Sequence, residues 1–308
     1  MPLKIVHGNI TTMKVDAIVC PTDPYYSGGG GLDGQIHRAA GEELDEVCLD
    51  LPLCETGTAS LTPGYKLPCK YIIHTTGPVW QGGARYEKAL LESCYKECLK
   101  LAKDNKCKTV AFPLISSGTF RYPKDQVFLV AMNTISEFLM ENEMLVYIVV
   151  YDKSSYEISK RLTTTVDEIL EKPPQVLQQQ VEMSVPKTLE EALKGIQCTF
   201  TEYLFQKIRE KDMSEVKVYK LANLDRKHFS KIRNNKDYQP SKRTVLALAC
   251  ALKLSLGETS QMLAKAGFAL CNNNITDIIV SYFIMTGHYN VMEINLVLFD
   301  YGQQSLGF

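Results

Sequence analysis

A glycine-rich segment near the start of the chain, Gly28–Gly41, has residue types that suit a negatively charged ligand. It reads GGGGLDGQIHRAAG, and an amphipathic stretch begins just past Asp33. Glycine adopts positive φ at no steric cost. A glycine-rich loop that leads into a helix presents unpaired N–H groups and the positive end of the helix dipole. His37 and Arg38 follow at fixed offsets, and a second loop, Ser116–Phe120, also carries glycine and hydroxyl groups. Together these features predict a phosphate-bearing ligand.

The elements around these loops follow the pattern of an α/β layer fold, because short apolar segments alternate with longer helical ones over the first ~165 residues. The expected buried strands are Leu3–Val6, Ala17–Cys20, Tyr71–Thr75, Thr109–Pro113 and Leu145–Val150. The expected helices are Gln35–Leu51, Arg85–Asp104, Lys124–Asn142 and Ser155–Glu168. In the second of these helices apolar residues recur every three to four positions, which predicts one buried face.

A change of pattern at Glu171–Lys187 predicts a boundary between two domains. This segment holds three prolines and a glutamine run, which is typical of a linker. The sequence after it predicts only helices, namely Thr188–Lys211, Glu215–Ala222, Arg226–Asn234, Lys242–Lys253, a helix after Ser255, Asp277–Met285 and Val291–Phe299. Ser214 and Asp225 are expected N-caps, and Ser255 with Glu258 has capping-box spacing. We therefore expect a first domain over residues 1–170, a linker over 171–187 and a smaller all-α domain over 188–308.

Composition sets broad limits on function. The 308 residues suffice for about two domains, and 45% hydrophobic with 22% charged residues is typical of a soluble globular protein. The net charge of −1 argues neither for nor against nucleic acid. Between Lys217 and Arg243, however, there are nine basic and two acidic residues. That stretch is the strongest candidate for a one-signed surface.

The ten cysteines and the apolar segments predict a reduced, cytoplasmic protein. Met1–Ile10 has the pattern of a strand and a polar loop and not of a signal peptide, and no apolar run approaches the ~18 residues of a membrane span. Thiols in such a chain are usually reduced. Cys94 and Cys98 lie four apart on an expected helix, but no second pair at zinc-finger spacing accompanies them. We expect no metal and no other cofactor.

The N-terminal part resembles the macro domain family. The motifs that carry the resemblance are GNIT at Gly8–Thr11, VDAIV at Val15–Val19, GGGGLDGQIHRAAG, YIIHTTGPVW at Tyr71–Trp80 and FPLISSGTFRYP at Phe112–Pro123. They occur in the family's order and cover almost all of residues 1–165. The resemblance implies a three-layer α/β/α fold with a mixed sheet and a cleft for ADP-ribose at the strand ends.

The resemblance also implies which residues bind the ligand. The two loops would hold the diphosphate, Phe120 would stack on the distal ribose and Ile10 would line the adenine pocket. The full expected set is Asn9, Ile10, Gly28, Gly29, Gly30, Gly31, Leu32, Ser116, Ser117, Gly118, Thr119 and Phe120. Backbone N–H and hydroxyl donors in the second loop suit an anion.

Asp33 and His37 match the acidic residue and the histidine of the hydrolytic, MacroD-type branch of that family. There the carboxylate helps to place or activate a water near the distal ribose, and a carboxylate in that place is a suitable general base. Two plainer interpretations stay open. Asp33 could cap the following helix, and His37 could be a packed or surface histidine.

Two positions depart from the family pattern. Asp23 stands where the family carries asparagine, and an ionised carboxylate accepts hydrogen bonds but cannot donate one to a ribose hydroxyl. Asp23 could instead act as a second catalytic carboxylate, or it could be held near the ligand phosphates at an electrostatic cost. Asn9 stands where an acidic residue reads the adenine amino group, and it could accept that bond with less charge behind it. The insert that binds zinc in another macro-domain subclass is replaced here by Pro24–Ser27.

Residues 216–259 resemble a Cro/repressor-type helix-turn-helix, with Phe229 and Ile232 expected inside. In that family the second helix enters the major groove of DNA. The residues placed there are Arg226, Lys227, Lys231 and Arg233. Lys236, Lys242 and Arg243 are the expected backbone contacts. Similar helical bundles dock proteins, so the partner is either DNA or a cognate protein. The whole architecture resembles uncharacterised bacterial macro-domain proteins.

Three functions follow from these observations. The first is an enzyme that hydrolyses ADP-ribosyl esters, either on acidic side chains or in O-acetyl-ADP-ribose. The second is a non-catalytic sensor or sequestering protein for ADP-ribose or another NAD-derived nucleotide. The third is a regulator in which the macro domain reverses a modification and the helical domain engages DNA or protein. The pair Asp33 and His37 favours the first function, whereas Asp23 and Asn9 favour the second.

Overall fold

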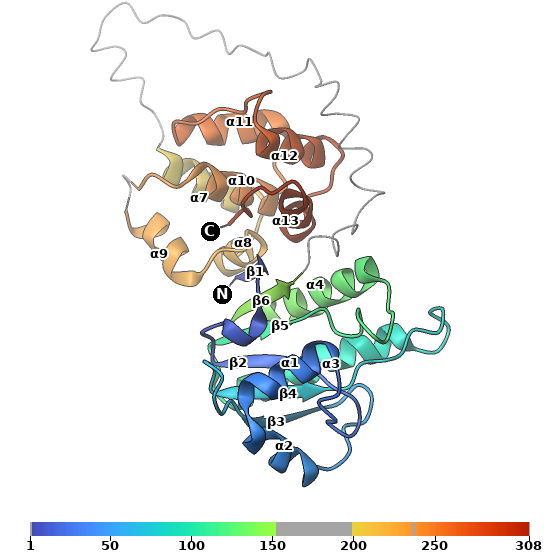
Figure 1. Cartoon of the computed structure of the whole chain (residues 1–308). Helices are drawn as coiled ribbons and strands as arrows, with labels where there is room; N and C mark the ends of the chain where they lie inside the picture. Colours follow the sequence, from blue (N-terminus) through green and yellow to red (C-terminus); the bar gives the residue numbers. More distant parts are fainter. Residues whose placement is uncertain (1, 152–198, 236–237, 308) are drawn as a thin grey trace, which may run out of the picture. The chain divides into compact units, whose positions relative to one another are not determined.

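The computed structural model describes residues 2–151, 199–235 and 238–307 (Figure 1). The chain forms two compact units, Met1–Ile158 and Ser159–Phe308. The expected helix Ser155–Glu168, the expected linker Glu171–Lys187 and the first part of the expected helix Thr188–Lys211 lie outside the described residues.

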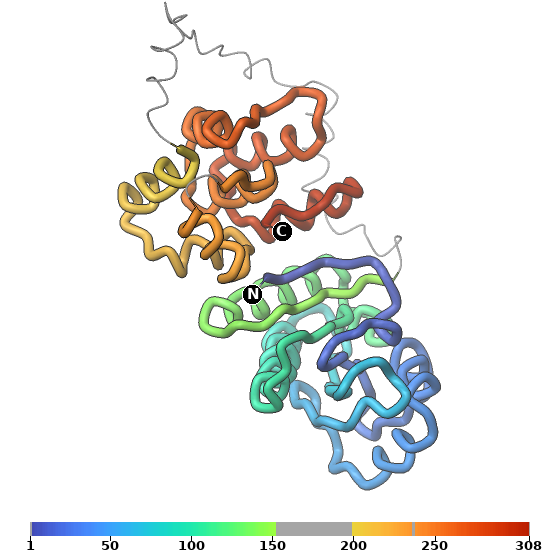
Figure 2. The backbone as a smooth tube through the Cα atoms, turned by 90° about the vertical axis from the view of Figure 1, so that its left-hand side faces the viewer, coloured from blue at the N-terminus to red at the C-terminus, as the bar shows by residue number. Residues whose placement is uncertain are grey.

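The first unit is built on a six-stranded mixed sheet with the order β1-β6-β5-β2-β4-β3. The strands are β1 (Leu3–His7), β2 (Ala17–Pro21), β3 (Ala59–Pro63), β4 (Tyr71–Thr75), β5 (Thr109–Phe112) and β6 (Leu145–Val150). β3 pairs antiparallel to β4, and the other pairs are parallel. Figure 2 shows β1 beside β6, although about 140 residues separate them in sequence. The mixed sheet expected from the resemblance is therefore present.

The strand β3 is the one that the sequence prediction missed. Its residues, ASLTP, are mostly half-buried, and only Thr62 is buried. It lies at the edge of the sheet and pairs only with β4. Proline has no backbone N–H to donate, and an edge strand tolerates this because no strand pairs with its outer side. A short edge strand of small residues has little apolar periodicity, so its pairing with β4 decides its conformation.

One expected helix, Gln35–Leu51, is two helices in the structure. They are α1 (Gly31–Ala40) and α2 (Glu42–Leu49), separated by Gly41 at φ 99°. The Gly41 N–H donates to the carbonyl of His37, 3.0 Å away, which closes α1. The apolar period continues across this break, so only the backbone of one glycine divides the helix.

Helices cover both faces of the sheet. α1 and α2 share a core with Ile72 of β4, while its neighbour Ile73 points to the opposite face because side chains alternate along a strand. On that second face Tyr95 of α3 (Glu87–Asp104) packs on Phe112 of β5, with ring centroids 5.4 Å apart. α4 (Lys124–Glu141) lies against α3. The first unit is thus the three-layer α/β/α fold that was expected (Figure 1).

The described part of the second unit is all helical, as expected. Its helices are α7 (Phe200–Glu210), α8 (Glu215–Leu221), α9 (Arg226–Asn234), α10 (Lys242–Ala251), α11 (Leu256–Lys265), α12 (Ile275–Met285) and α13 (Val291–Asp300), which gather around one core (Figure 2). Ser214 and Asp225 cap α8 and α9, and Ser255 forms a capping box with Glu258. These expected caps are confirmed.

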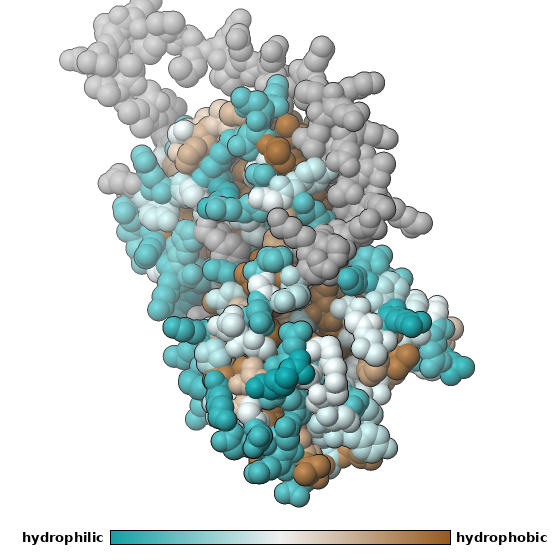
Figure 3. Space-filling model, viewed as in Figure 1, coloured by the Kyte–Doolittle hydropathy of each residue, from teal (hydrophilic) through white to brown (hydrophobic). Residues whose placement is uncertain are grey.

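Among the described residues, no helix combines the length and the apolar character needed to cross a membrane. On the face of the described residues seen in Figure 3, hydrophobic surface is scattered between hydrophilic side chains. The nine cysteines within the described ranges are free thiols, and all except Cys69 and Cys271 are buried.

Candidate functional site

The loops after β2, β4 and β5 meet at the carboxyl ends of the parallel strands. The Thr22 N–H donates to the carbonyl of Thr75, 3.0 Å away, and the Trp80 N–H donates to the carbonyl of Phe120 at 2.9 Å. β2 lies between β4 and β5. After β2 the chain forms β3 and β4 on one side of it, and then crosses to form β5 on the other side. In open α/β sheets ligands bind in the crevice at such a switch point.

The glycine loop leaves open space in front of its backbone. Gly28 and Gly31 have φ values of 60° and 59°, which only glycine adopts freely. A Cβ atom on Gly28 would also lie 2.8 Å from Nδ1 of His37, whereas one on Gly29 or Gly30 would meet nothing within 4 Å. The helix α1 begins at Gly31, so Leu32 and Asp33 lie in its first turn and not before it.

Asp33 is buried and ties the glycine loop to β2. Its carboxylate accepts hydrogen bonds from Sγ of Cys20 (3.1 Å), Oγ1 of Thr22 (3.3 Å) and the N–H of Gly28 (3.2 Å). Burial raises the pKa of Asp33, and the Cys20 hydrogen bond and the His37 ring oppose this effect. Gly30 is the N-cap of α1, so the alternative that Asp33 caps this helix is wrong.

His37 is packed inside the unit and also faces Asp33. Its Nδ1 lies 2.5 Å from Oδ1 of Asp45, and its Nε2 lies 3.5 Å from Oδ1 of Asp33. The ring is 5% exposed, so it is not a surface histidine. The i, i+4 spacing on α1 puts both side chains on one helix face.

Asp23 organises the loop between β2 and the glycines. Its Oδ1 accepts from the N–H of Tyr25 (2.8 Å) and more weakly from that of Ser27 (3.3 Å). Its charge is one of the contributions that raise the pKa of Asp33. The structure thus gives Asp23 a turn-forming contact, and its catalytic role stays a prediction.

Asn9 caps the short 3₁₀ helix Ile10–Thr12. Its Oδ1 accepts from the N–H of Thr11 at 3.0 Å and from the Thr11 hydroxyl at 2.8 Å. Both lone pairs of that oxygen are engaged, so the acceptor expected to read the adenine amino group is already in use. Ile10 is buried in the core that α1 and α2 share with the sheet.

The second loop is strained where it approaches β4. Ser116 has φ 66°, and its hydroxyl is buried with no hydrogen-bond partner among the described residues. Strained backbone clusters at ligand sites. The hydroxyl of Ser117 donates to the carbonyl of Leu114, while Gly118 and Thr119 are exposed and Phe120 is half-buried.

Two residues at this end of the sheet, Gly77 and Glu87, were not predicted from the sequence. A Cβ atom on Gly77 would overlap Oγ of Ser116 and would lie 2.7 Å from Cγ2 of Ile115, so only glycine lets the second loop come this close. Buried Glu87 accepts from the N–H groups of Gln81, Gly83 and Arg85. Although burial opposes it, these bonds lower the pKa of Glu87. The signal for Glu87 in the sequence was an acidic residue at the start of an expected helix, shortly after Gly82 and Gly83.

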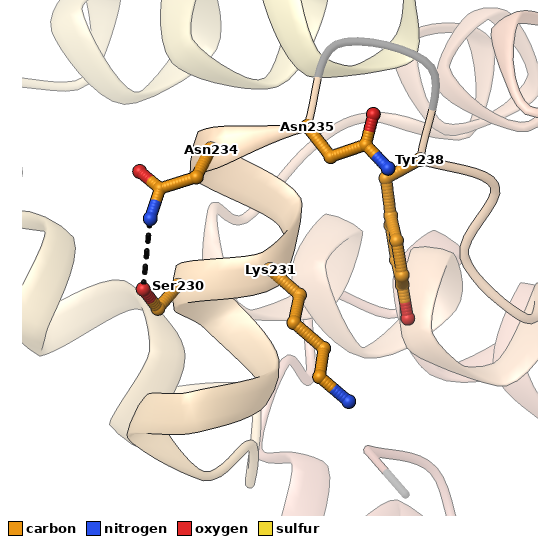
Figure 4. A pocket seen from close by; sticks show the side chains of 5 residues that line it. All are labelled: Ser230, Lys231, Asn234, Asn235 and Tyr238. Carbon is orange, nitrogen blue, oxygen red and sulfur yellow. Dashed lines mark hydrogen bonds between the residues drawn. The ribbon is translucent and has the colours of Figure 1, made fainter.

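The four basic residues expected to contact DNA are all exposed on α9, namely Arg226, Lys227, Lys231 and Arg233. Phe229 and Ile232 face inward, as expected. A pocket of about 340 Å³ lies beside this helix. Figure 4 shows its lining side chains and the hydrogen bond that Asn234 donates to Ser230. Its lining consists of Ser230, Lys231, Asn234, Asn235 and Tyr238.

Some of the expected contacts with the DNA backbone have partners within the chain. The ammonium group of Lys242 lies 2.5 Å from the carboxylate of buried Asp277, so this lysine already has an ion-pair partner within the fold. Arg243 donates to the side chain of Gln304. Arg233, one of the residues expected in the major groove, pairs with Glu215 at 3.4 Å. Lys236 lies outside the described residues.

Comparison with known proteins identifies the class that this fold and site define. Residues 19–131 match the Macro domain family. A macro domain-containing protein of Methanosarcina mazei is 48% identical over 166 residues, which are 53% of this chain and 89% of that protein. This chain therefore belongs to the macro domain family.

Two further relatives carry functional information in their names. An O-acetyl-ADP-ribose deacetylase of Enterobacter cloacae is 42% identical over 55% of this chain and 97% of its own length. The solved Oceanobacillus iheyensis macrodomain with ADP is 36% identical, covers 54% of this chain and 93% of its own, and has a TM-score of 0.50. About half of this chain lies outside each of these matches.

Proposed function

We propose that the first unit binds ADP-ribose at the carboxyl ends of its strands and hydrolyses ADP-ribosyl esters there. The observation that carries the proposal is the position of Asp33. Its carboxylate contacts both the glycine loop, through Gly28, and the end of β2, through Cys20. The named deacetylase and the macrodomain that holds ADP support the ligand class.

In the proposed reaction the two loops hold the diphosphate by their backbone N–H groups. Asp33 takes a proton from a water molecule, and the oxygen of that water bonds to the electrophilic carbon of the ester. The bond from that carbon to the leaving oxygen breaks, and the leaving oxygen departs as a carboxylate or takes a proton as a ribose hydroxyl. His37, held by Asp45, packs beside the Asp33 carboxylate at 3.5 Å and limits the space in which it can move.

The experiment measures binding and turnover on the same protein. Calorimetry with ADP-ribose should give one site per chain, and the protein should release the label from an ADP-ribosylated acidic peptide or deacetylate O-acetyl-ADP-ribose. Asp33→Asn, which keeps a carbonyl oxygen to accept from the Gly28 N–H, should abolish turnover and leave most of the binding. If the protein binds ADP-ribose but neither wild type nor variant turns over either substrate, the enzyme proposal fails.

A second candidate is a sensor that binds ADP-ribose without turnover. Asn9 favours it, because its carbonyl oxygen is engaged by Thr11, and so does Asp23, whose carboxylate holds a turn. The same experiment separates the two candidates, since binding without turnover is what the sensor predicts.

For the second unit we propose a helix-turn-helix-like domain, over residues 188–308, that engages DNA. The exposed basic side chains of α9 support this role, together with the short turn that joins α8 to α9. The segment 171–187 is the proposed linker, and 1–170 the proposed extent of the macro domain. A regulator that couples ADP-ribose chemistry to DNA or protein binding would have this organisation.

A further inference from the structure

Three side chains that bind metals in other proteins converge inside the first unit. His37 comes from α1, Cys48 from α2 and His74 from β4, and all three are buried. One ligand atom from each lies within 4.8 Å of the other two. No motif in the sequence links these three residues, because they are spread over 38 positions and three elements.

The hydrogen bonds of the two imidazoles have the arrangement of metal-binding histidines. Nδ1 of His37 contacts Asp45 at 2.5 Å, and Nε2 of His74 contacts the hydroxyl of Thr62 at 2.9 Å. The other nitrogen of each ring, Nε2 of His37 and Nδ1 of His74, is buried without a hydrogen-bond partner among the described residues. Metal-binding histidines are usually held in this way, with one nitrogen fixed by a polar group and the other left for the ion.

A partnerless nitrogen inside a protein is costly, because it has lost its hydrogen bonds to water. Here there are two, on rings that are 5% and 0% exposed. Oδ1 of Asp33 lies 3.5 Å from Nε2 of His37, too far to satisfy that nitrogen well. An ion among the three side chains would take one nitrogen from each ring as a ligand.

We propose that His37, Cys48 and His74 form a site for a divalent ion of the zinc class, with Asp33 as the fourth ligand. Two imidazoles and a thiolate suit Zn²⁺, Co²⁺ or Cu²⁺ and not Mg²⁺ or Ca²⁺, which prefer oxygen. In a tetrahedral site with bonds of about 2.0–2.3 Å, ligand atoms are about 3.3–3.8 Å apart. The widest pair therefore has to close by at most about 1 Å.

The charges of this site balance. Cys48 binds as a thiolate and releases its proton to solvent, and Asp33 adds a second negative charge. Together they neutralise a divalent ion, which removes most of the cost of burying it. The side chain of Asp33 is 10% exposed, so the ion can enter from that side.

A bound ion would also change the proposed reaction, and this consequence depends on the proposed function. Asp33 is the proposed base, and a carboxylate that coordinates an ion cannot accept a proton from water as readily. One equivalent of Zn²⁺ should therefore inhibit hydrolysis. The binding itself does not depend on any activity.

The test uses the full chain freed of metal with a chelator and titrated with Co²⁺. Tetrahedral Co²⁺ with a thiolate ligand gives visible d–d bands and a near-ultraviolet charge-transfer band. We expect both bands to saturate at one equivalent and to disappear when Zn²⁺ is added. If no bands develop at several equivalents, the proposal is overturned.

Matched variants assign the ligands. Cys48→Ser should remove the charge-transfer band, whereas Cys54→Ser, which changes a buried thiol in the same core, should keep it. Asp45 is exposed, so Asp45→Asn should leave the fold intact and weaken Co²⁺ binding about 10- to 100-fold by releasing the outer nitrogen of His37. A charge-transfer band that persists in Cys48→Ser contradicts the site.

Zn²⁺ inhibition separates the two proposals. A chain that binds Co²⁺ as described but shows no hydrolase activity contradicts the proposed function and not the ion site. Hydrolysis that continues unchanged with one Zn²⁺ bound overturns the assignment of Asp33 as the fourth ligand.

Discussion

The carboxylate of Asp33 accepts a hydrogen bond from the backbone N–H of Gly28, 3.2 Å away. This bond joins the proposed base to the loop that is expected to hold the phosphates, although five positions separate the two residues. A shift of the loop therefore moves the base, and a change of the base loosens the loop. Binding and chemistry should be coupled at this point.

The first prediction concerns Gly28. Gly28→Ala forces a side chain into φ 60° and against the ring of His37. We expect it to lower the free energy of unfolding by about 1–2 kcal/mol and the affinity for ADP-ribose more than tenfold. Urea unfolding followed by Trp80 fluorescence and calorimetry measure the two effects.

Gly29→Ala is the control for Gly28→Ala, because its Cβ atom would meet nothing within 4 Å. It should leave the unfolding free energy nearly unchanged. Equal stability losses in the two variants would contradict the steric argument for Gly28.

The second prediction concerns Gly77, which the sequence analysis did not single out. Gly77→Ala would overlap the Ser116 hydroxyl and press on Ile115, so the second loop must move away from β4. We expect ADP-ribose affinity to fall at least tenfold, as measured by calorimetry. Gly257→Ala, on α11 with open space around it, is the control for a glycine-to-alanine change. Unchanged affinity in Gly77→Ala would show that this loop does not hold the ligand.

The third prediction concerns Asn9. Asn9→Asp keeps an oxygen to cap the helix Ile10–Thr12, since both residue types are good caps. It also adds a second, charged oxygen that can accept from the adenine amino group, and charge-assisted bonds are roughly twice as strong as neutral ones. We expect ADP-ribose affinity to rise about threefold to tenfold in calorimetry. A lower affinity would place the adenine elsewhere.

The sequence predicted elements with a strong period and missed features that depend on distant contacts. The strand Tyr71–Thr75 was predicted with its observed bounds because an apolar run marks it. The helix Arg226–Asn234 was predicted with its observed bounds because the N-cap Asp225 marks its start. The break at Gly41 was missed, since the apolar positions on both sides keep the helical period. Only the backbone conformation of that residue ends the helix.

The site was predictable where its residues are neighbours along the chain. Asp33 and His37 are four positions apart on one helix, so their proximity follows from the helical repeat. The approach of Gly77 to Ser116 joins the loops after two different strands, and no local pattern encodes it. The meeting of His37 with His74 likewise depends on how α1 packs on the sheet.

The fourth prediction concerns the pH dependence of stability in the second unit. The hydrogen bond from Lys207, supported by the N–H of Ser255, lowers the pKa of Glu258 to about 2. A carboxylate whose folded pKa is depressed stabilises the fold above its unfolded pKa of about 4.3, and this contribution is lost as the pH falls towards 2. Glu258→Gln should therefore cost about 1 kcal/mol at pH 7 and much less near pH 2.5.

Urea unfolding of the full chain followed by circular dichroism measures this difference. Trp80, the one tryptophan of the chain, reports the first unit separately and should not respond to the change. Lys207→Gln should weaken the pH dependence only in part, because the N–H of Ser255 still donates to Glu258 in that variant. An equal cost of Glu258→Gln at both pH values would contradict the assignment.

The fifth prediction tests α9 as a DNA-binding helix. Lys227 and Lys231 are exposed and one turn apart, and each phosphate contact contributes about one to the slope of log affinity against log salt. On a random duplex, the double variant Lys227→Ala/Lys231→Ala should weaken binding and reduce that slope by about two, whereas Lys265→Ala on α11 should do neither. Fluorescence anisotropy at several salt concentrations measures both quantities. Wild-type protein that does not bind duplex at low salt would favour a protein partner for this helix, because a basic DNA-binding surface must gain affinity as salt falls.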